Sequence, residues 1–484
     1  MTRAGASGGR HLSRLLLTVL SVLVLLATVV GAGVSVVMGQ LAGNITAIDV
    51  SEQLGGSGAT EPIVAVNEET GTYEPLNIVL MGSDTREGKG NGGFGSVDKF
   101  GTAQRSDTVI VLHISGDRKS AVGVSIPRDT IIDLPTCKND GKKVGGYSGR
   151  FNQAIELGGP GCTIKAVNEM SGLDISNFML VDFGGFKRIV DAIGGVEICL
   201  ATAIDDPLSG LKLDKGKHVV QGEEALAFVR ARHNIGDGSD TSRIRRQQAF
   251  ISSLLRQVLS SGTLLNPASL VGVLNAATKS LTADTQLADV NNLKDLALSL
   301  KDLRPANVTF VTVPWTPNGD NATVSVNTKK AAPLWDAMKN DTPWPPPSTT
   351  TAADGTTATT DQPLLRTKPE NIKVNVLNGT AEKGKAKRVA KLLRKQGYSV
   401  QEVGNADTTD VTTTTVQYDP AWDTSAKTLM YAATAPGEKV KKQGGTMNLI
   451  IGTDFTDIKP VEISDLTQDY TAQVNTGDEE FCAS

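Results

Sequence analysis

The sequence predicts an α/β fold: an α/β/α sandwich with a mixed central sheet, plus a small C-terminal α/β domain, behind a single N-terminal transmembrane helix. Three runs rich in β-branched residues, at 76–82, 108–114 and 120–126, follow one another as strands. Helix and strand spacing then alternates through much of 151–195. Helices of this kind must bury their apolar faces on the sheet, which predicts the layered sandwich.

The uncharged run at residues 15–38 predicts the membrane helix, because it is long enough to cross a bilayer. Three arginines precede the run, so the positive-inside rule leaves residues 1–14 in the cytoplasm and everything after the helix outside it. The alternative is a cleaved signal peptide, which Gly31-Ala32-Gly33 would support. The run exceeds the usual length of a secretory apolar region, and we therefore expect a single-pass anchor.

Composition divides the rest of the chain. Residues 341–368 are rich in Pro, Thr and Ala and cannot bury a core, so they predict a linker between two domains. The full expected order is a cytoplasmic N-terminus at 1–14, the anchor at 15–38, a Gly- and Ser-rich spacer at 39–72, a main domain at 73–340, the linker at 341–368, a second domain at 369–456 and a tail at 457–484.

The second domain is predicted to be small and α/β. Alternating Ile372, Val374 and Val376 indicate a strand, and an apolar helical stripe follows the Asn378-Gly379 turn. Two further strand-like runs complete it.

The net charge of the whole chain is −4, which argues against general nucleic-acid binding because no overall positive field would hold a polyanion.

Charged residues are expected to gather at one edge of the main sheet. The five-residue connection 115–119 predicts a hairpin, so the strands at 108–114 and 120–126 should be antiparallel. The start of the first then lies beside the end of the second. If 76–82 is also antiparallel to 108–114, its end reaches the same edge. The side chains gathered there are Asp84, Arg105, Asp107, Arg128 and Asp129.

This combination suits a metal-assisted phosphate or pyrophosphate site. Carboxylate oxygens are ligands for a hard divalent cation such as Mg²⁺, and arginine forks match phosphate oxygens. The structural alternative is a network of Arg/Asp salt bridges.

A later segment adds basic residues. A short helix is expected to end near 232, and Ser239 or Asp240 can cap a second helix whose first turns carry arginines on one face. A helix N-terminus of this type suits a phosphate, although a solvated basic face is the alternative. The residues concerned are Arg230, Arg232, Asp240, Arg243, Arg246 and Gln247.

Four cysteines, Cys137, Cys162, Cys199 and Cys482, are free to oxidise if the chain is exported. Three full pairings are possible. A bond between Cys137 and Cys162 would close a loop beside the candidate site and leave Cys199 for Cys482; buried free thiols are the alternative.

Six segments in order resemble the LytR-CpsA-Psr family of bacterial cell-wall enzymes: "LNIVLMGSDTR", "RSDTVIVLHI", "SIPRDT", "RFNQAIELGG", "ALAFVRARH" and "SDTSRIRRQQ". Residues 371–454 are similar to the LytR_C-like domain that often accompanies the family. The resemblance implies transfer of a glycopolymer from a polyprenyl-pyrophosphate carrier to peptidoglycan, usually at the muramic acid 6-hydroxyl, outside the cell and with Mg²⁺ or Mn²⁺. A pyrophosphatase side activity is possible in such an enzyme.

The resemblance also assigns roles, and Asp84 is our choice of general base. The implied metal and catalytic carboxylates are Asp84 and Asp107; the implied pyrophosphate ligands are Arg105, Arg128 (also catalytic), Arg230, Arg232, Arg243, Arg246 and Gln247; Asp240, Asp129 and Asn152 complete the implied site. One departure is Arg150, which stands where the family commonly has Lys.

Two alternatives to an enzyme remain from other classes: a non-catalytic binder or scaffold for lipid-linked wall precursors, and a transcriptional regulator. The export signal and the lack of a basic DNA-reading motif argue against the regulator. The chain contains no P-loop, G-x-S-x-G or H-E-x-x-H motif.

The Ala-, Gly- and Thr-rich composition is compatible with arabinogalactan as the polymer, with teichoic acid, capsule or a glycosylated surface protein as alternatives. The basic run at 383–395 is typical of a solvated helix face, with contact to a wall polymer as the functional alternative.

Overall fold

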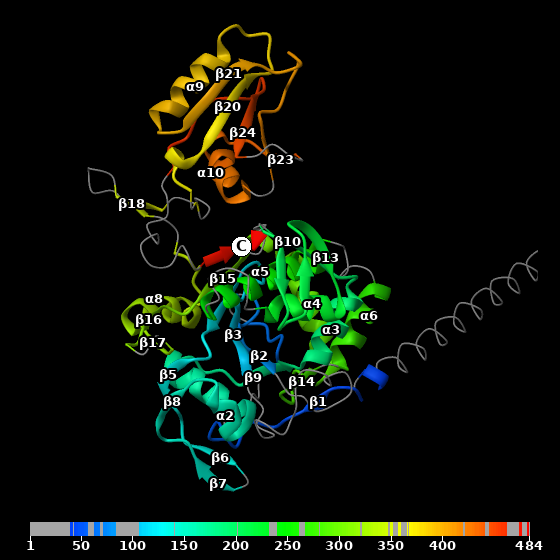
Figure 1. The fold of residues 1–484 in the computed structure, drawn as a ribbon. Coiled ribbons are helices and arrows are strands. Elements are labelled where there is room, and N and C mark those ends of the chain that lie inside the picture. Colours follow the sequence, from blue (N-terminus) through cyan, green and yellow to red (C-terminus); the bar gives the residue numbers. More distant parts are fainter. Residues whose placement is uncertain are drawn as a thin grey trace, which may run out of the picture.

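The computed structural model describes residues 39–41, 43–56, 62–67, 71–83, 106–139, 141–200, 202–231, 240–260, 267–279, 281–319, 322–346, 349–351, 357–359, 365, 367–419, 422–440, 445–461, 474–476 and 482–483. Figure 1 shows a large α/β body and a smaller α/β domain that follows it in the chain. The predicted anchor at 15–38 lies outside the described residues. No helix in the described ranges is long and apolar enough to cross a bilayer.

The central sheet of the large body is mixed, as predicted. β2 (Leu76–Ser83) pairs antiparallel with β3 (Ser106–Ile114), and β3 pairs antiparallel with β4 (Ala121–Ile126). β9 (Asn177–Val181) and β15 (Val308–Thr312) run parallel to β2 and β4 respectively. Over the described residues its order is β1 (Thr46–Ala47), β14 (Leu281–Ala283), β9 (Asn177–Val181), β2 (Leu76–Ser83), β3 (Ser106–Ile114), β4 (Ala121–Ile126), β15 (Val308–Thr312) and β25 (Val474–Thr476).

Helices cover both faces of this sheet because its strands alternate their apolar side chains between two cores. Val79 and Met81 of β2 pack in one core with α2 (Gln153–Ser171) and α8 (Thr328–Lys339). Ile78 packs in the other core, to which α5 (Asp240–Ser260), α6 (Pro267–Thr278) and α7 (Val290–Ser299) contribute. The period of two along β2 therefore produces the predicted sandwich.

Smaller units flank the sandwich (Figure 1). Phe250 of α5 is buried with α3 (Phe183–Ala192), α4 (Gly222–Arg230) and the strands β10 (Val196–Leu200), β11 (Ile204–Asp206), β12 (Leu211–Leu213) and β13 (Gly216–Val220). A second sheet has the order β16 (Trp315–Pro317), β17 (Val324–Val326), β5 (Thr130–Asp133) and β8 (Ser148–Arg150). The short pair β6 (Cys137–Asn139) and β7 (Lys142–Val144) extends beyond it.

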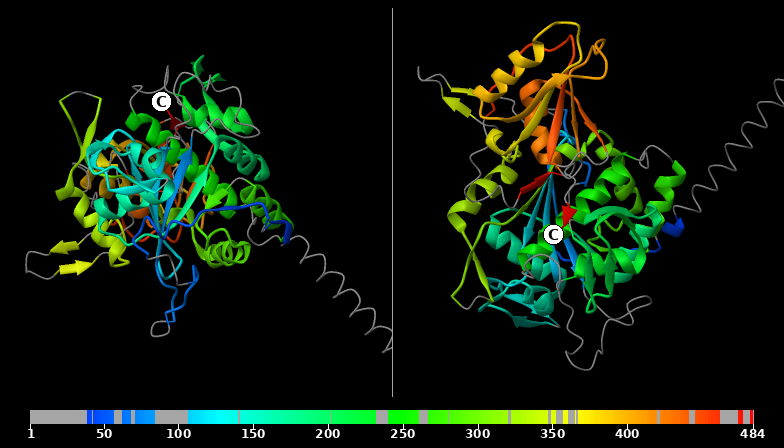
Figure 2. Two further views of the ribbon diagram at one scale, coloured as in Figure 1. Left: turned by 90° about the horizontal axis from the view of Figure 1, so that it is seen from below. Right: turned by 45° about the horizontal axis from the view of Figure 1, so that its top comes forward.

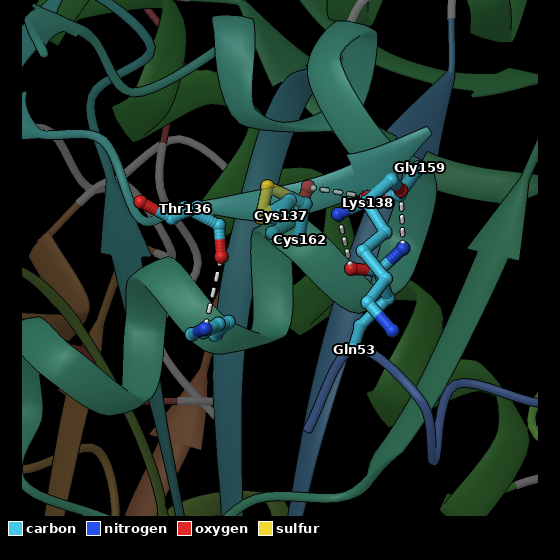
Figure 3. The surroundings of a disulfide bond; sticks show 8 residues. Gln53, Thr136, Cys137, Lys138, Gly159 and Cys162 are labelled. Carbon is cyan, nitrogen blue, oxygen red and sulfur yellow. Dashed lines mark hydrogen bonds between the residues drawn. A yellow bond between two sulfur atoms is a disulfide. The ribbon is translucent and has the colours of Figure 1, made fainter. Parts of the chain in front are cut away.

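A disulfide joins Cys137 of β6 to Cys162 of α2, with Cα atoms 5.8 Å apart. α2 is kinked at Gly158-Gly159, and a side chain at Gly158 would meet the Cβ atoms of both cysteines at 3.0 Å. Figure 3 shows Gln53 beside this bond, accepting from the Lys138 backbone N–H at 2.9 Å. Cys199 is also disulfide-bonded, and the backbone of Cys482 in β26 (Cys482–Ala483) lies in register with it.

The described parts of residues 39–72, a range expected as a spacer, contribute to the sandwich. Leu41, Val50 and Ile63 are buried, and β1 extends the central sheet beside β14. The tail returns as well, since β25 pairs antiparallel with β15 at the edge of the sheet. Strands of two or three residues are too short to show a periodicity, which is why the sequence pattern did not predict them.

The C-terminal domain has its own core and appears as a separate unit in Figure 2. Its described sheet has the order β21 (Ser399–Asn405), β20 (Lys373–Asn378), β24 (Thr446–Ile451), β22 (Thr415–Tyr418) and β23 (Gly437–Lys439). Two helices, α9 (Lys385–Lys395) and α10 (Asp423–Ala433), bury their apolar sides with Val374, Val376 and Leu449. In the linker, β18 (Thr349–Thr351) pairs with β19 (Thr357–Thr359).

Candidate active site

The predicted edge of the sheet is present. The end of β2, the start of β3 and the end of β4 lie side by side, with Gly82 opposite Thr108 and Val109 opposite Ile126. The register shifts next, so that Ser83 pairs with Ser106 and Asp107 is the extra residue of a β-bulge. Bulges redirect side chains and occur often beside active sites. The hydroxyl of Ser106 holds this one by donating to the carbonyls of Gly82 and Thr108, at 3.2 and 3.0 Å.

Arg128 follows β4 at this edge and is held by its neighbour. Its Nε lies 3.3 Å from Oδ2 of Asp129, while Oδ1 of the same carboxylate lies 3.2 Å from Nη1 of Arg150. The side chains of Arg128 and Asp129 are about four-fifths buried, and that of Arg150 is half exposed. The backbone N–H of Asn152 donates to the Arg128 carbonyl at 3.1 Å. Asn152 precedes α2, but its side chain makes no capping bond to that helix.

Helix α5 is fixed to the same edge through two adjacent glutamines. The Thr108 hydroxyl donates to Oε1 of Gln247 at 3.1 Å, and Nε2 of Gln247 donates to the carbonyl of Val229 at 3.4 Å. Gln248 is fully buried, and its Nε2 donates to Oγ of Ser125 on β4 at 3.0 Å. These bonds link β3, β4 and the end of α4 into one unit.

The predicted arginines of the later segment divide into two environments. Arg243 and Arg246 are buried at 3% and 2% exposure, and Nη2 of Arg246 donates to the Ala231 carbonyl just beyond α4. Arg230, at the end of α4, is only partly buried and lies over the ring of Phe183, 4.7 Å from its centroid. Phe183 begins α3 directly after β9, whose end lies beside that of β2. Arg230 therefore belongs to the same edge as Arg128.

Part of the predicted site lies beyond the described residues: Asp84, Arg105 and Arg232 entirely, and Asp107 and Asp240 for their side chains. Among the residues described, no cluster of three His, Cys, Asp or Glu side chains could hold a metal. The predicted carboxylates adjoin the paired residues Ser83 and Ser106. Two carboxylates at such positions have the oxygen chemistry that Mg²⁺ or Mn²⁺ requires.

Comparison with known proteins places this chain in a family. The model of the LytR_cpsA_psr family matches residues 37–340, and a model described as LytR cell envelope-related transcriptional attenuator matches residues 371–455. The chain belongs to the LytR-CpsA-Psr family. The match begins at residue 37 and so includes the whole segment expected as a spacer, in agreement with the burial of Leu41 and Val50.

Named relatives of this LytR-CpsA-Psr protein include the cell wall biosynthesis protein LcpA of Corynebacterium glutamicum, 32% identical over 82% of this chain and 77% of that one. The polyisoprenyl-teichoic acid–peptidoglycan teichoic acid transferase TagU of Oceanobacillus iheyensis is 28% identical over 43% of this chain and 59% of its own. Among solved structures, the LytR-Csp2A-Psr enzyme from Actinomyces oris is 22% identical, covering 55% of this chain and 89% of that one, with a TM-score of 0.43.

Two features of the site were missed from the sequence. Phe183 was not singled out within the stretch 151–195, although its position after a strand parallel to β2 places it at the charged edge. The bond between Thr108 and Gln247 depends on how α5 packs on β3, and no local pattern indicates it. Arg150, which stands where the family commonly has Lys, pairs with the same Asp129 carboxylate that holds Arg128.

Proposed function

We propose that this LytR-CpsA-Psr protein is an extracytoplasmic phosphotransferase that attaches a glycopolymer from a polyprenyl-pyrophosphate carrier to peptidoglycan. The observation that carries the proposal is the convergence of Arg128, Arg230 and Gln247 on the edge where Asp107 is bulged out of β3. The names of LcpA and TagU, which concern wall biosynthesis and teichoic acid transfer, support it. The anchor at 15–38 would place the reaction at the outer face of the cell membrane, on the side of the cell wall.

In this proposal the 6-hydroxyl oxygen of muramic acid attacks the phosphorus that carries the glycopolymer. A new P–O bond to the muramic acid forms, the bond to the bridging pyrophosphate oxygen breaks, and polyprenyl phosphate leaves. The hydroxyl proton passes to a carboxylate, for which Asp84 is our choice. No electron transfer or further co-reactant is needed.

Catalysis in this proposal depends mainly on the arginines, which position the pyrophosphate and neutralise its charge. Arg128 is restrained through Nε by Asp129, so its guanidinium is oriented before the substrate arrives. Arg230 is restrained by the Phe183 ring, over which its guanidinium lies. The ring carries no negative charge, so it does not compete with the pyrophosphate for this cation. Asp84 and Asp107 would hold Mg²⁺ or Mn²⁺, which when bound would neutralise pyrophosphate charge.

The test is transfer by the protein from residue 39 onward, because that boundary keeps the buried segment at 39–72. It is incubated with a labelled polyprenyl-pyrophosphoryl saccharide, peptidoglycan strands and Mg²⁺. Label should move to the glycan and stop with chelator, and Arg128→Ala should lower the rate by about a hundred-fold, as for loss of one oriented donor. Arg304→Ala is the matched control, because Arg304 is exposed and precedes β15 at the opposite edge of the sheet.

Tight binding of the lipid with no transfer under either Mg²⁺ or Mn²⁺ would instead support the binder or scaffold. The donor sugar would be varied next, comparing arabinogalactan with teichoic acid precursors. Each donor would be tested with the same pair of variants.

A further inference from the structure

Helix α9 of the C-terminal domain carries a strongly basic surface that the proposed reaction does not use. We call this set the α9 basic surface, and all its members are exposed: Lys383, Lys387, Arg388, Lys391, Arg394 and Lys395. The helix itself, "KAKRVAKLLRK", contains no acidic residue. Glu382 lies beside it and pairs with Arg388. Within the part of the chain that the structure describes, none of the other five cations of this surface forms an ion pair.

Ordinary helix stability explains only part of this pattern. Arg394 and Lys395 lie in the last turn, where cations interact favourably with the helix dipole. Lys387, Lys391 and Lys395, however, recur at every fourth position, where like charges repel. They form a row with a spacing of about 6 Å along the helix axis. A row of this kind destabilises the helix unless something anionic lies along it.

The opposite side of α9 decides what kind of anion fits. Ala386, Val389, Ala390 and Leu393 are buried in the core of the domain. A helix that binds a membrane surface inserts an apolar face between the lipids, and α9 has already committed that face to its own domain. What remains is a straight row of cations, which matches a chain of regularly spaced negative charges.

We propose that the α9 basic surface binds a linear polyanion, of the chemical class of a phosphate-bearing wall glycopolymer. This site is separate from the catalytic edge, lies in a domain with its own core, and does not depend on the proposed transfer reaction. It assigns the C-terminal domain the role of retaining an anionic polymer.

The test measures binding of inorganic polyphosphate, as the probe polyanion, to the protein from residue 39 onward. The α9 variant is Lys387→Gln with Lys391→Gln and Lys395→Gln. The matched control is Lys142→Gln with Lys143→Gln and Lys301→Gln, which removes the same charge from exposed positions outside the domain. A third protein carries arginine at the three α9 positions and keeps the charge.

Wild type, the control and the arginine variant should bind with similar affinity, and the glutamine variant at least about ten-fold more weakly. Its plot of log affinity against log salt should also be shallower by about two, for three lost contacts with a flexible polyanion. Circular dichroism should show an unchanged fold, since removing like charges relieves repulsion.

Equal binding by the control and the α9 glutamine variant would overturn the proposal. So would a wild-type preference for phosphatidylglycerol vesicles at equal phosphate, which would make the partner a membrane. Transfer activity with a short neutral saccharide donor should be the same in all the variants. Its loss in every protein, wild type included, would count against the proposed function and leave the binding result standing.

Discussion

Arg150 lies 3.2 Å from the carboxylate of Asp129, although 20 residues separate them in the chain. The antiparallel pairing of β5 and β8, which sets Ile131 opposite Arg150, brings them together. The same carboxylate holds Nε of Arg128. One acid thus orients two arginines at the candidate site. A substitution of Asp129 therefore tests the orientation of these arginines, because it leaves both of their charges in place.

Asp129→Asn should lower kcat by roughly ten-fold without raising KM, because it adds net positive charge while releasing both guanidiniums. Steady-state transfer kinetics measure both parameters. Asp133→Asn is the control, since Asp133 is an exposed acid at the end of β5, the strand that directly follows Asp129. A raised KM at constant kcat would show that Asp129 acts in ground-state binding instead.

Phe183→Leu should weaken substrate binding by about five-fold, since a cation–aromatic contact contributes about 1 kcal/mol. The loss should come from poorer placement of Arg230, which lies over the ring. Titration with a polyprenyl pyrophosphate measures it, and Phe183→Tyr, which keeps an aromatic face, should bind like wild type. Equal weakening in both variants would exclude the ring contact as the cause.

Replacing Cys137 and Cys162 together by serine should lower the free energy of unfolding by about 3 kcal/mol, because the bond closes a loop of about 25 residues in the unfolded chain. Urea denaturation under oxidising conditions measures the difference. A loss below about 1 kcal/mol would mean that the glycine-rich turn of α2 and the hydrogen bonds of Gln53 hold β6 in place without the disulfide.

His113 should make stability depend on pH. It is 3% exposed, lies 3.0 Å from Asp341 and 2.9 Å from Asn77, and burial lowers its pKa, with Arg118 acting in the same direction and Asp341 opposing them. The unfolded chain therefore takes up the proton first as pH falls. The contribution of His113 is complete above its unfolded pKa of about 6.5 and is lost as pH falls from there towards the lower folded pKa.

His113→Gln tests this dependence, because glutamine does not titrate. Unfolding free energies of the variant and wild type, measured between pH 8 and pH 5, should converge as pH falls. A constant difference across that range would show that the pKa of His113 is the same in the folded and the unfolded protein.

The same residues show where sequence reasoning was sufficient. The hairpin at 115–119 predicted that the end of β4 meets the start of β3, and the structure has that arrangement. The end of β2 was expected at the same edge only if β2 pairs antiparallel with β3, and the structure shows that pairing. Local chemistry was enough, because a short turn between two strands forces antiparallel pairing. In the C-terminal domain the β20 strand and the α9 helix were predicted, whereas β21 and α10 were not.

The sequence by itself determined the sandwich, the polar edge, its candidate residues and the family, because strand periodicity, turn chemistry and ordered motifs are local properties. Only the tertiary structure decided that Asp129 joins Arg128 to Arg150, that Phe183 supports Arg230, and that 39–72 and the tail add strands to the main sheet. These contacts join segments far apart in the chain. Their partners are chosen by how elements pack, and a pattern of neighbouring residues does not contain that information.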